Sequence, residues 1–170
     1  MGKINYANQM NIPQHDAKLT FDSPIGAITV LAQDNRVVFL SMGNEITPDF
    51  GKASVLKDAK NQLQAYFKGK SMDLNFPVAL CGTKFQQSVW REIEKVGFGE
   101  VTTYAEIAKK IGNPKAVRAV GGAVGSNPVP LVIGCHRVLG ASGRITGYSG
   151  GDGIPTKRWL LNLEGIETTD

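Results

Sequence analysis

Short apolar runs rich in β-branched side chains occupy the first part of the chain. The runs lie at residues 18–22, 25–33 and 36–42. Turn-forming pairs, Ser23-Pro24 and Asp34-Asn35, separate them. This pattern predicts a small antiparallel sheet of sequential strands. Residues 1–16, which precede it, are polar and carry no periodicity, so we expect a loose arm there.

The spacing of apolar residues changes after this sheet. Between Ser54 and Lys68 they recur at helical intervals, and Gly69 supplies a stop. We therefore expect one helix to cover one face of the sheet. An extended stretch then leads to a boundary near residues 80–83, which divides the chain into an amino-terminal domain, 1–82, and a second domain, 83–170.

The second half is predicted to be mostly helical. Thr83 can cap a helix whose apolar face consists of Phe85, Val89, Trp90 and Ile93. Gly97 and Gly99 end that helix.

A helix-turn-helix candidate follows. Thr103 and Glu106 match the capping box S/T-x-x-E, which predicts a helix from Tyr104 to Ile111. Gly112-Asn113-Pro114 breaks the chain, and a further helix is expected over about 115–125. Two helices joined by a short glycine-containing turn form the unit that many proteins use to bind DNA.

The second of these helices, in KAVRAVGGAVGSN, is unusually slim. Glycine and alanine stand where a major-groove helix would carry long polar side chains, and Arg118 is its one long cation after Lys115 at the start. Such a helix suits the minor groove, which is only about 6 Å wide. Close packing of small residues in a protein core is the alternative explanation.

Composition and charge narrow the class of protein. The 170 residues are 42% hydrophobic and 20% charged, which excludes a wholly disordered or fibrous chain. No apolar run approaches the roughly 20 residues of a membrane span, and no apolar signal segment opens the chain. Only two cysteines occur, Cys81 and Cys135, which is too few for a disulfide framework. We expect a cytoplasmic protein.

The net charge of +4 is distributed unevenly. Residues 1–82 hold eight Lys/Arg against seven Asp/Glu, whereas residues 83–165 hold eleven against six. The basic excess therefore lies in the half with the helix-turn-helix candidate, which favours a polyanionic partner.

The segment NPVPLVIGCHRVL carries the most reactive chemistry. Leu131-Val132-Ile133 is predicted to be a buried strand that delivers Cys135, with His136 and Arg137 beside it. A thiolate is the reactive form of cysteine, and a neighbouring imidazole or cation lowers the thiol pKa from about 8.5. Alternatively, Cys135 is a small core residue, a reading that its polar neighbours count against.

The same residue types also occur in two other kinds of site. A zinc site is disfavoured, because neither cysteine belongs to a Cys-x-x-Cys pair. A cysteine hydrolase would need a cysteine, a histidine and an orienting acid or amide, and the spacing alone leaves that class open.

The last segments complete the candidate site. GRITGYSGG lacks the ending of a phosphate-binding loop and is typical of a pocket wall where backbone approaches a flat ligand. A closing helix is expected over Pro155 to Leu163, with Trp159 and Leu160 on its apolar face. Glu164 after it is either a solvated charge or the acid that orients His136.

Taken together, these residues resemble the O6-alkylguanine-DNA alkyltransferases, also called methylated-DNA protein-cysteine methyltransferases. The resemblance is close over residues 83–165, through RAVGGA, NPVP, CHRV, GYSGG and KRWLLNLEG, and weaker before, through SPIG and QLQAYFKGK. It implies an α+β fold: a small amino-terminal antiparallel sheet with a covering helix, then a helical domain with a helix-turn-helix and a buried active-site cysteine.

The activity that the resemblance implies is DNA repair by direct reversal. A methyl or larger alkyl group would pass from O6 of guanine in double-stranded DNA to Cys135, once per molecule, after the base is flipped through the minor groove. Activity on O4 of thymine is left open. The implied protein needs no metal or other cofactor, and we expect a monomer. Relatives that only sense lesions lack the cysteine, which this chain has.

The resemblance also assigns roles to single residues. Cys135 would accept the alkyl group, His136 would deprotonate it through a water, and Glu164 would orient the imidazole. Asn127 would brace the turn before the cysteine, and Tyr104 would rotate the phosphate and assist the leaving guanine. The implied DNA contacts are Arg118, which fills the gap left by the base, Tyr104, Thr103, Ala119, Gly122, Ser126 and Arg137. The implied pocket residues are Pro130, Val138, Tyr148 and Ser149.

One position departs from the family pattern. Proline usually precedes the cysteine, and here the residue is Gly134. Glycine lacks the fixed φ of proline, so the departure puts local rigidity in question.

Overall fold

The computed structural model describes residues 12–168 of the chain, so most of the expected amino-terminal arm, residues 1–11, lies outside the described residues. Residues 12–16 are not loose. The backbone N–H of Asp16 donates to the carbonyl of Ala32, and the His15 ring lies 5.7 Å from that of Phe50. This part of the predicted arm therefore packs against the sheet.

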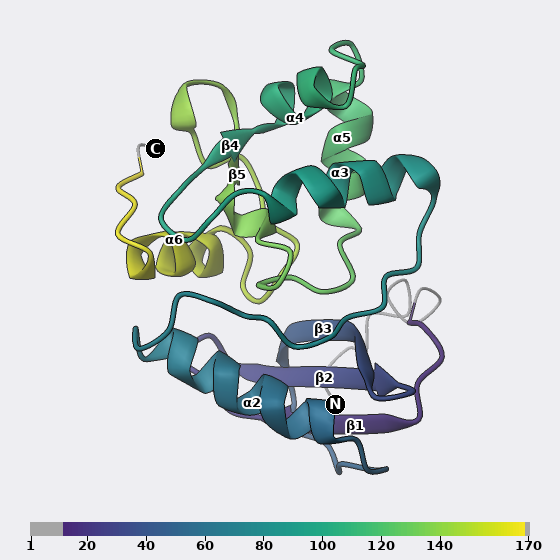
Figure 1. Cartoon of the computed structure of the whole chain (residues 1–170). Helices are drawn as coiled ribbons and strands as arrows, with labels where there is room; N and C mark the ends of the chain where they lie inside the picture. Colours follow the sequence, from purple (N-terminus) through teal and green to yellow (C-terminus); the bar gives the residue numbers. More distant parts are fainter. Residues whose placement is uncertain (1–11, 169–170) are drawn as a thin grey trace.

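The first half forms the predicted sheet and helix. Strands β1 (Ala17–Phe21), β2 (Ala27–Gln33) and β3 (Arg36–Asn44) pair antiparallel in sequence order, and α2 (Ser54–Phe67) covers one face (Figure 1). Asp34 and Asn35 both have positive φ, 51° and 60°, as the tight turn of a twisted hairpin requires. The apolar side of α2 is buried against the strands, which confirms the helical spacing read from the sequence.

The regular structure of the second half is mainly helical, as predicted. Its elements are α3 (Lys84–Glu94), β4 (Thr102–Thr103), α4 (Tyr104–Lys110), α5 (Val117–Gly125), η1 (Cys135–Arg137), β5 (Val138–Leu139), η2 (Ala141–Gly143) and α6 (Ile154–Leu163). Helices α4 and α5 form the helix-turn-helix and lie above the sheet, beyond α3 (Figure 1). None of the helices in residues 12–168 is both long and apolar enough to cross a membrane.

The two predicted helix caps differ in outcome. Thr83 and Gln86 form a complete reciprocal capping box at the start of α3. At α4, Thr103 accepts from the backbone N–H of Glu106, but the Glu106 carboxylate accepts from the Thr102 hydroxyl instead of reaching back to the cap. The second box is therefore only half formed, because Thr102 competes for the carboxylate.

Two hydrophobic cores hold the chain together. One lies between the sheet and α2 and also takes in Val129, Leu131 and Leu160 from the second half. The other lies among α3, α4 and α5 and includes Cys135. Because the first core draws on both halves, the division at residues 80–83 stays a prediction.

The segment before the cysteine is not the predicted strand. Within it only an isolated bridge joins Pro130 to Ile133, and Leu131 has a φ of 76°, in the left-handed region. Pro128 and Pro130 lack the N–H groups that a sheet ladder needs, so the apolar run folds into a compact turn. The strand β5 comes after the cysteine. It pairs parallel with β4, the strand that directly precedes α4 in the sequence.

Candidate active site

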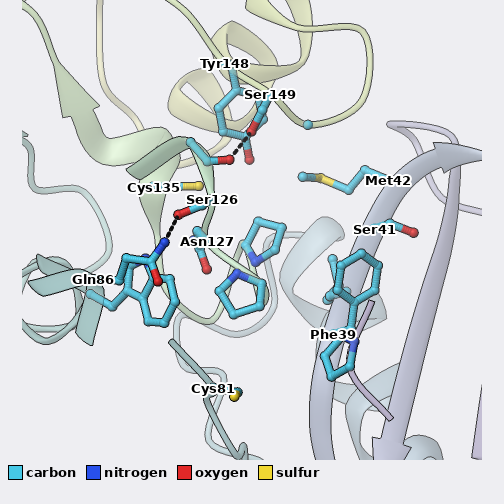
Figure 2. A pocket seen from close by; sticks show the side chains of 17 residues that line it. Phe39, Ser41, Met42, Cys81, Gln86, Ser126, Asn127, Cys135, Tyr148 and Ser149 are labelled. Atoms are coloured by element: carbon cyan, nitrogen blue, oxygen red, sulfur yellow. Dashed lines mark hydrogen bonds between the residues drawn. The ribbon is translucent and has the colours of Figure 1, made fainter. Parts of the chain in front are cut away.

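Cys135 begins the 3₁₀ turn η1 and forms part of the wall of a cavity of about 410 Å³ between the two halves. It is reduced and only 5% exposed. Figure 2 shows the cavity with Cys135, Asn127 and Tyr148 on one side and Phe39, Ser41 and Met42 of β3 opposite. Pro130, Ser126 and Ser149 also line it, and Cys81 lies at its far end. The β3 wall could not be found from the sequence, because nothing local marks those residues.

The carboxylate of Glu164, the residue that caps the end of α6, organises the site. His136 Nε2 lies 2.5 Å from its Oε2, and Arg137 binds both oxygens through Nε at 2.8 Å and Nη2 at 3.0 Å. The Gly99 N–H and the Tyr66 hydroxyl complete the set, at 3.0 and 2.7 Å. Glu164 is thus a buried acid that contacts the imidazole, and the reading of it as a solvated charge is wrong.

These contacts determine the protonation states of Glu164 and His136. Burial alone would favour neutral Glu164, but hydrogen bonds from His136, Arg137 and Tyr66 hold the pKa of its carboxyl below the usual range. Burial also lowers the pKa of His136, although Glu164 opposes that shift. An ionised Glu164 accepts a hydrogen bond from Nε2 of His136, so Nε2 carries the proton and the lone pair of the neutral imidazole is on Nδ1. Nδ1 has no hydrogen-bond partner within residues 12–168.

The thiol itself is not activated in the predicted way. Burial raises the pKa of Cys135, and the polar groups of Asn127 and Tyr148 and the charge of Lys157 only partly oppose it. His136 and Arg137 are adjacent in sequence, yet both side chains end on Glu164. Although they neighbour Cys135 in the sequence, His136 and Arg137 therefore do not direct their side chains to its sulfur.

Asn127 braces the turn that leads to the cysteine. Its Nδ2 donates to the carbonyl of Ile133 at 2.8 Å, and its Oδ1 accepts from the N–H of Val129 at 2.9 Å. One side chain thus joins both sides of the segment whose prolines prevent strand pairing. The geometry agrees with the bracing role that the resemblance implied.

Lys157 is a buried cation that the sequence interpretation missed. It is 0% exposed, and its Nζ donates to the carbonyls of Val138 at 2.6 Å and Gly147 at 3.0 Å. Burial lowers the pKa of Lys157 to about 8. Its position three and four residues before Leu160 and Leu161, on one face of α6, was the signal available in the sequence.

Not every expected pocket residue is available to a ligand. The Val138 side chain is fully buried and its carbonyl accepts from Lys157. Tyr148 does face the cavity, and its buried hydroxyl has no hydrogen-bond partner in the described part of the chain. Ser149 donates to the carbonyl of Gly125 at 3.3 Å.

The expected DNA contacts separate into two groups. Arg118, Ala119, Gly122 and Ser126 are exposed on or just after α5, and Thr103, Tyr104 and Arg118 line an open depression beside that helix. Arg137 is only 8% exposed and donates to Glu164 and to the Val96 carbonyl. Its position contradicts the expectation of a DNA contact, because its donors are already used inside the protein.

The glycines of α5 decide between the two explanations of its slimness. A Cβ added at Gly121, Gly122 or Gly125 would meet nothing within 4 Å. These glycines are thus not required for packing inside the protein. They leave one face of the helix free for close approach by an external partner.

The Arg137 side chain occupies the space beside Gly134. The Gly134 φ of −70° lies in the range of proline, but a Cβ would come within 2.9 Å of Arg137 Nη1 and 3.1 Å of Cδ. The arginine side chain therefore uses the space that glycine leaves, and a larger residue would oblige it to shift.

The fold and the site together define a helix-turn-helix protein with a buried nucleophile and a histidine-carboxylate pair. Comparison with known proteins agrees with that class. The family model described as 6-O-methylguanine DNA methyltransferase, DNA binding domain, matches residues 84–166, and the ribonuclease-like domain of the same family matches residues 18–80.

Individual relatives are similar over most of their length. A methylated-DNA–protein-cysteine methyltransferase of Methanosarcina acetivorans is 44% identical over 152 residues, which cover 85% of this chain and 96% of the relative. The crystal structure of Mycobacterium tuberculosis OGT in complex with DNA matches with a TM-score of 0.78 and 41% identity, over 87% of this chain and 92% of that one. The chain belongs to the O6-methylguanine DNA methyltransferase family, which confirms the resemblance and the α+β fold predicted from the sequence.

Proposed function

We propose that this protein repairs double-stranded DNA by transferring an alkyl group from O6 of guanine to its own Cys135. The observation that carries the proposal is the buried thiol in a cavity, with a histidine-carboxylate pair behind it and a glycine-lined helix outside. The names of the relatives, methylated-DNA–protein-cysteine methyltransferases, support the same reaction. The enzyme class is a methyltransferase that acts on its own side chain.

The reaction begins with extrusion of the base. An alkyl group on O6 lies inside the duplex, so the guanine must leave the stack, at a cost of a few kcal/mol. The bare face of α5 suits a minor groove, and the exposed side chain of Arg118 is the proposed group that fills the gap left by the base. Thr103 and Tyr104, at the start of α4, flank the same depression.

The chemical step needs a thiolate and a proton for the departing guanine. His136 Nδ1 takes the thiol proton through a water, the sulfur bonds to the alkyl carbon, and the bond from that carbon to O6 breaks. The guanine anion then takes up a proton, for which Tyr104 is the proposed donor. Solvent restores the Tyr104 hydroxyl and takes the thiol-derived proton from His136. The thioether has no hydrolytic release step, so each molecule reacts once.

The cavity between Cys135 and the β3 residues Phe39, Ser41 and Met42 is larger than a methyl group needs. Met42 and Phe39 face Cys135 across it (Figure 2). We therefore expect larger alkyl groups to be accepted. We also expect a monomer that works in the cytoplasm, where both thiols stay reduced.

Mass spectrometry after incubation with an O6-methylguanine duplex tests the proposal. The expected result is the mass of one methyl group gained on the peptide that holds Cys135, no gain in Cys135→Ser, and a normal gain in Cys81→Ser. An unmodified protein that still binds the duplex tightly would indicate a lesion sensor. Repeated turnover on an ester or amide without DNA would indicate a hydrolase, and either result would overturn the proposal.

A further inference from the structure

Tyr66 lies in the first half of the chain, yet its hydroxyl ends in the proposed catalytic network. It belongs to the last turn of α2 and donates to Glu164 Oε2 at 2.7 Å. This is the oxygen that also lies 2.5 Å from His136 Nε2. The other donors to Glu164 in residues 12–168, His136, Arg137 and Gly99, belong to the second half.

Packing alone does not account for the hydroxyl. Tyr66 is only 1% exposed, and its ring stands edge-on to Phe98 and Phe67 at centroid distances of 6.1 and 5.6 Å. A phenylalanine would fill the same space, whereas a buried hydroxyl costs free energy unless it is hydrogen-bonded. Here the hydroxyl is hydrogen-bonded to Glu164, the carboxylate that contacts the proposed base.

We infer that Tyr66 is a positioning residue for alkyl transfer, through which the first half of the chain holds Glu164 and limits the basicity of His136. The inference rests on the proposed function and names a residue outside the expected catalytic set. Through Tyr66, the first half of the chain would contribute to the rate of alkyl transfer.

The physical argument concerns the charge on Glu164 Oε2. A donated hydrogen bond spreads that charge, so the carboxylate attracts a protonated imidazole less strongly. Removing the Tyr66 donor strengthens the attraction and raises the pKa of His136. The remaining charged groups near the imidazole, Arg137 and Lys157, both act to lower its pKa and are unchanged.

The sign of the effect on rate follows from the role of His136. A general base must be neutral, so the rate of transfer falls as the pH drops through the pKa of His136. A higher pKa moves this acid limb to higher pH. Glu164 also loses one of its fixed donors, which lets its carboxylate turn and lowers the maximal rate.

The test compares the full-length wild type with Tyr66→Phe and with Phe98→Leu. Phe98→Leu loosens packing around the same ring and keeps the hydrogen bond. The rate of Cys135 alkylation by O6-methylguanine duplex and by free O6-benzylguanine is measured across a pH series, together with duplex affinity and thermal unfolding. For Tyr66→Phe we expect about a tenfold slower transfer to both substrates, from the loss of one hydrogen bond to a charged group. We also expect an acid limb at higher pH and unchanged duplex affinity.

A second variant keeps the test decisive if Tyr66→Phe folds poorly. Replacement of Tyr66 by 3-fluorotyrosine retains the ring and makes the hydroxyl a stronger donor, so the acid limb should move to lower pH. An unchanged pH profile in the folded variant, or the same shift in Phe98→Leu, would overturn the inference. A wild-type protein that gains no alkyl group would instead overturn the proposed function itself.

Discussion

His136 and Glu164 face each other at 2.5 Å with both side chains completely buried. One belongs to the turn η1 that begins with the cysteine, and the other caps α6. Removing Glu164 leaves the buried Arg137 guanidinium and the N–H of neutral His136 without their acceptor, so the contact ties the chemistry of the site to the stability of the fold.

Replacement of Glu164 by glutamine should therefore destabilise the protein in a pH-dependent way. The folded-state pKa of Glu164 is depressed, so its stabilising contribution is present above the unfolded-state pKa of about 4.3 and is lost as the pH falls below it. Urea unfolding should show a constant gap between wild type and Glu164→Gln from pH 7 to 5, which narrows by about 1.4 kcal/mol per pH unit below that. A gap that is as wide at pH 3 as at pH 5 would contradict the assignment of an ionised Glu164.

Arg118→Ala should separate base extrusion from chemistry. Arg118 is exposed on α5, and its proposed part is to fill the space of the flipped base. Repair of an O6-methylguanine duplex should slow on the order of a hundredfold, from a loss of a few kcal/mol. Reaction with free O6-benzylguanine should stay at the wild-type rate. Equal losses on both substrates would argue against this role, and Lys115→Ala, also an exposed cation beside α5, serves as the control.

Lys157→Met should slow the alkylation of Cys135. The buried ammonium is one of the groups that oppose the raised thiol pKa, and its removal raises that pKa further. A rise of about one pKa unit lowers the thiolate fraction about tenfold. The rate of inactivation by O6-benzylguanine near pH 7 measures the effect. Lys109→Met, which removes an exposed lysine of α4, should react like the wild type.

Asn127 allows a matched pair of substitutions. Asn127→Asp keeps the acceptor for the Val129 N–H but loses the donor to the Ile133 carbonyl, whereas Asn127→Ala loses both. At about 1 kcal/mol for each hydrogen bond, Asn127→Ala should lower the free energy of unfolding by roughly 2 kcal/mol. Denaturant titration at neutral pH should place Asn127→Asp no higher than Asn127→Ala, because its carboxylate would face the Ile133 carbonyl oxygen with no proton between them. Wild-type stability in both variants would show that the turn needs no brace.

The local elements could be predicted because their signals lie within a few residues. Short runs of β-branched residues between turn-forming pairs located the sheet, helical apolar spacing located α2 and α3, and Thr83 marked the start of α3. Cys135 could be nominated from its own sequence neighbourhood, but the choice for Glu164 between a solvated charge and the acid that orients His136 depended on the resemblance to a family. The neighbours of Cys135 were misread for a related reason: the sequence shows adjacency, whereas the direction of Arg137 depends on α6, which lies far along the chain.

By itself, then, the sequence determined the strands, the helices, the helix-turn-helix and the reactive cysteine, because these follow from short-range periodicity, caps and a compact motif. Only the tertiary structure decided that Leu131 turns in the left-handed region, that Arg137 points inward and that Lys157 is buried. It alone brought Tyr66 to Glu164, 98 positions apart in the chain. These arrangements depend on which elements pack together, and burial and hydrogen bonding between distant segments leave no periodic trace in the sequence.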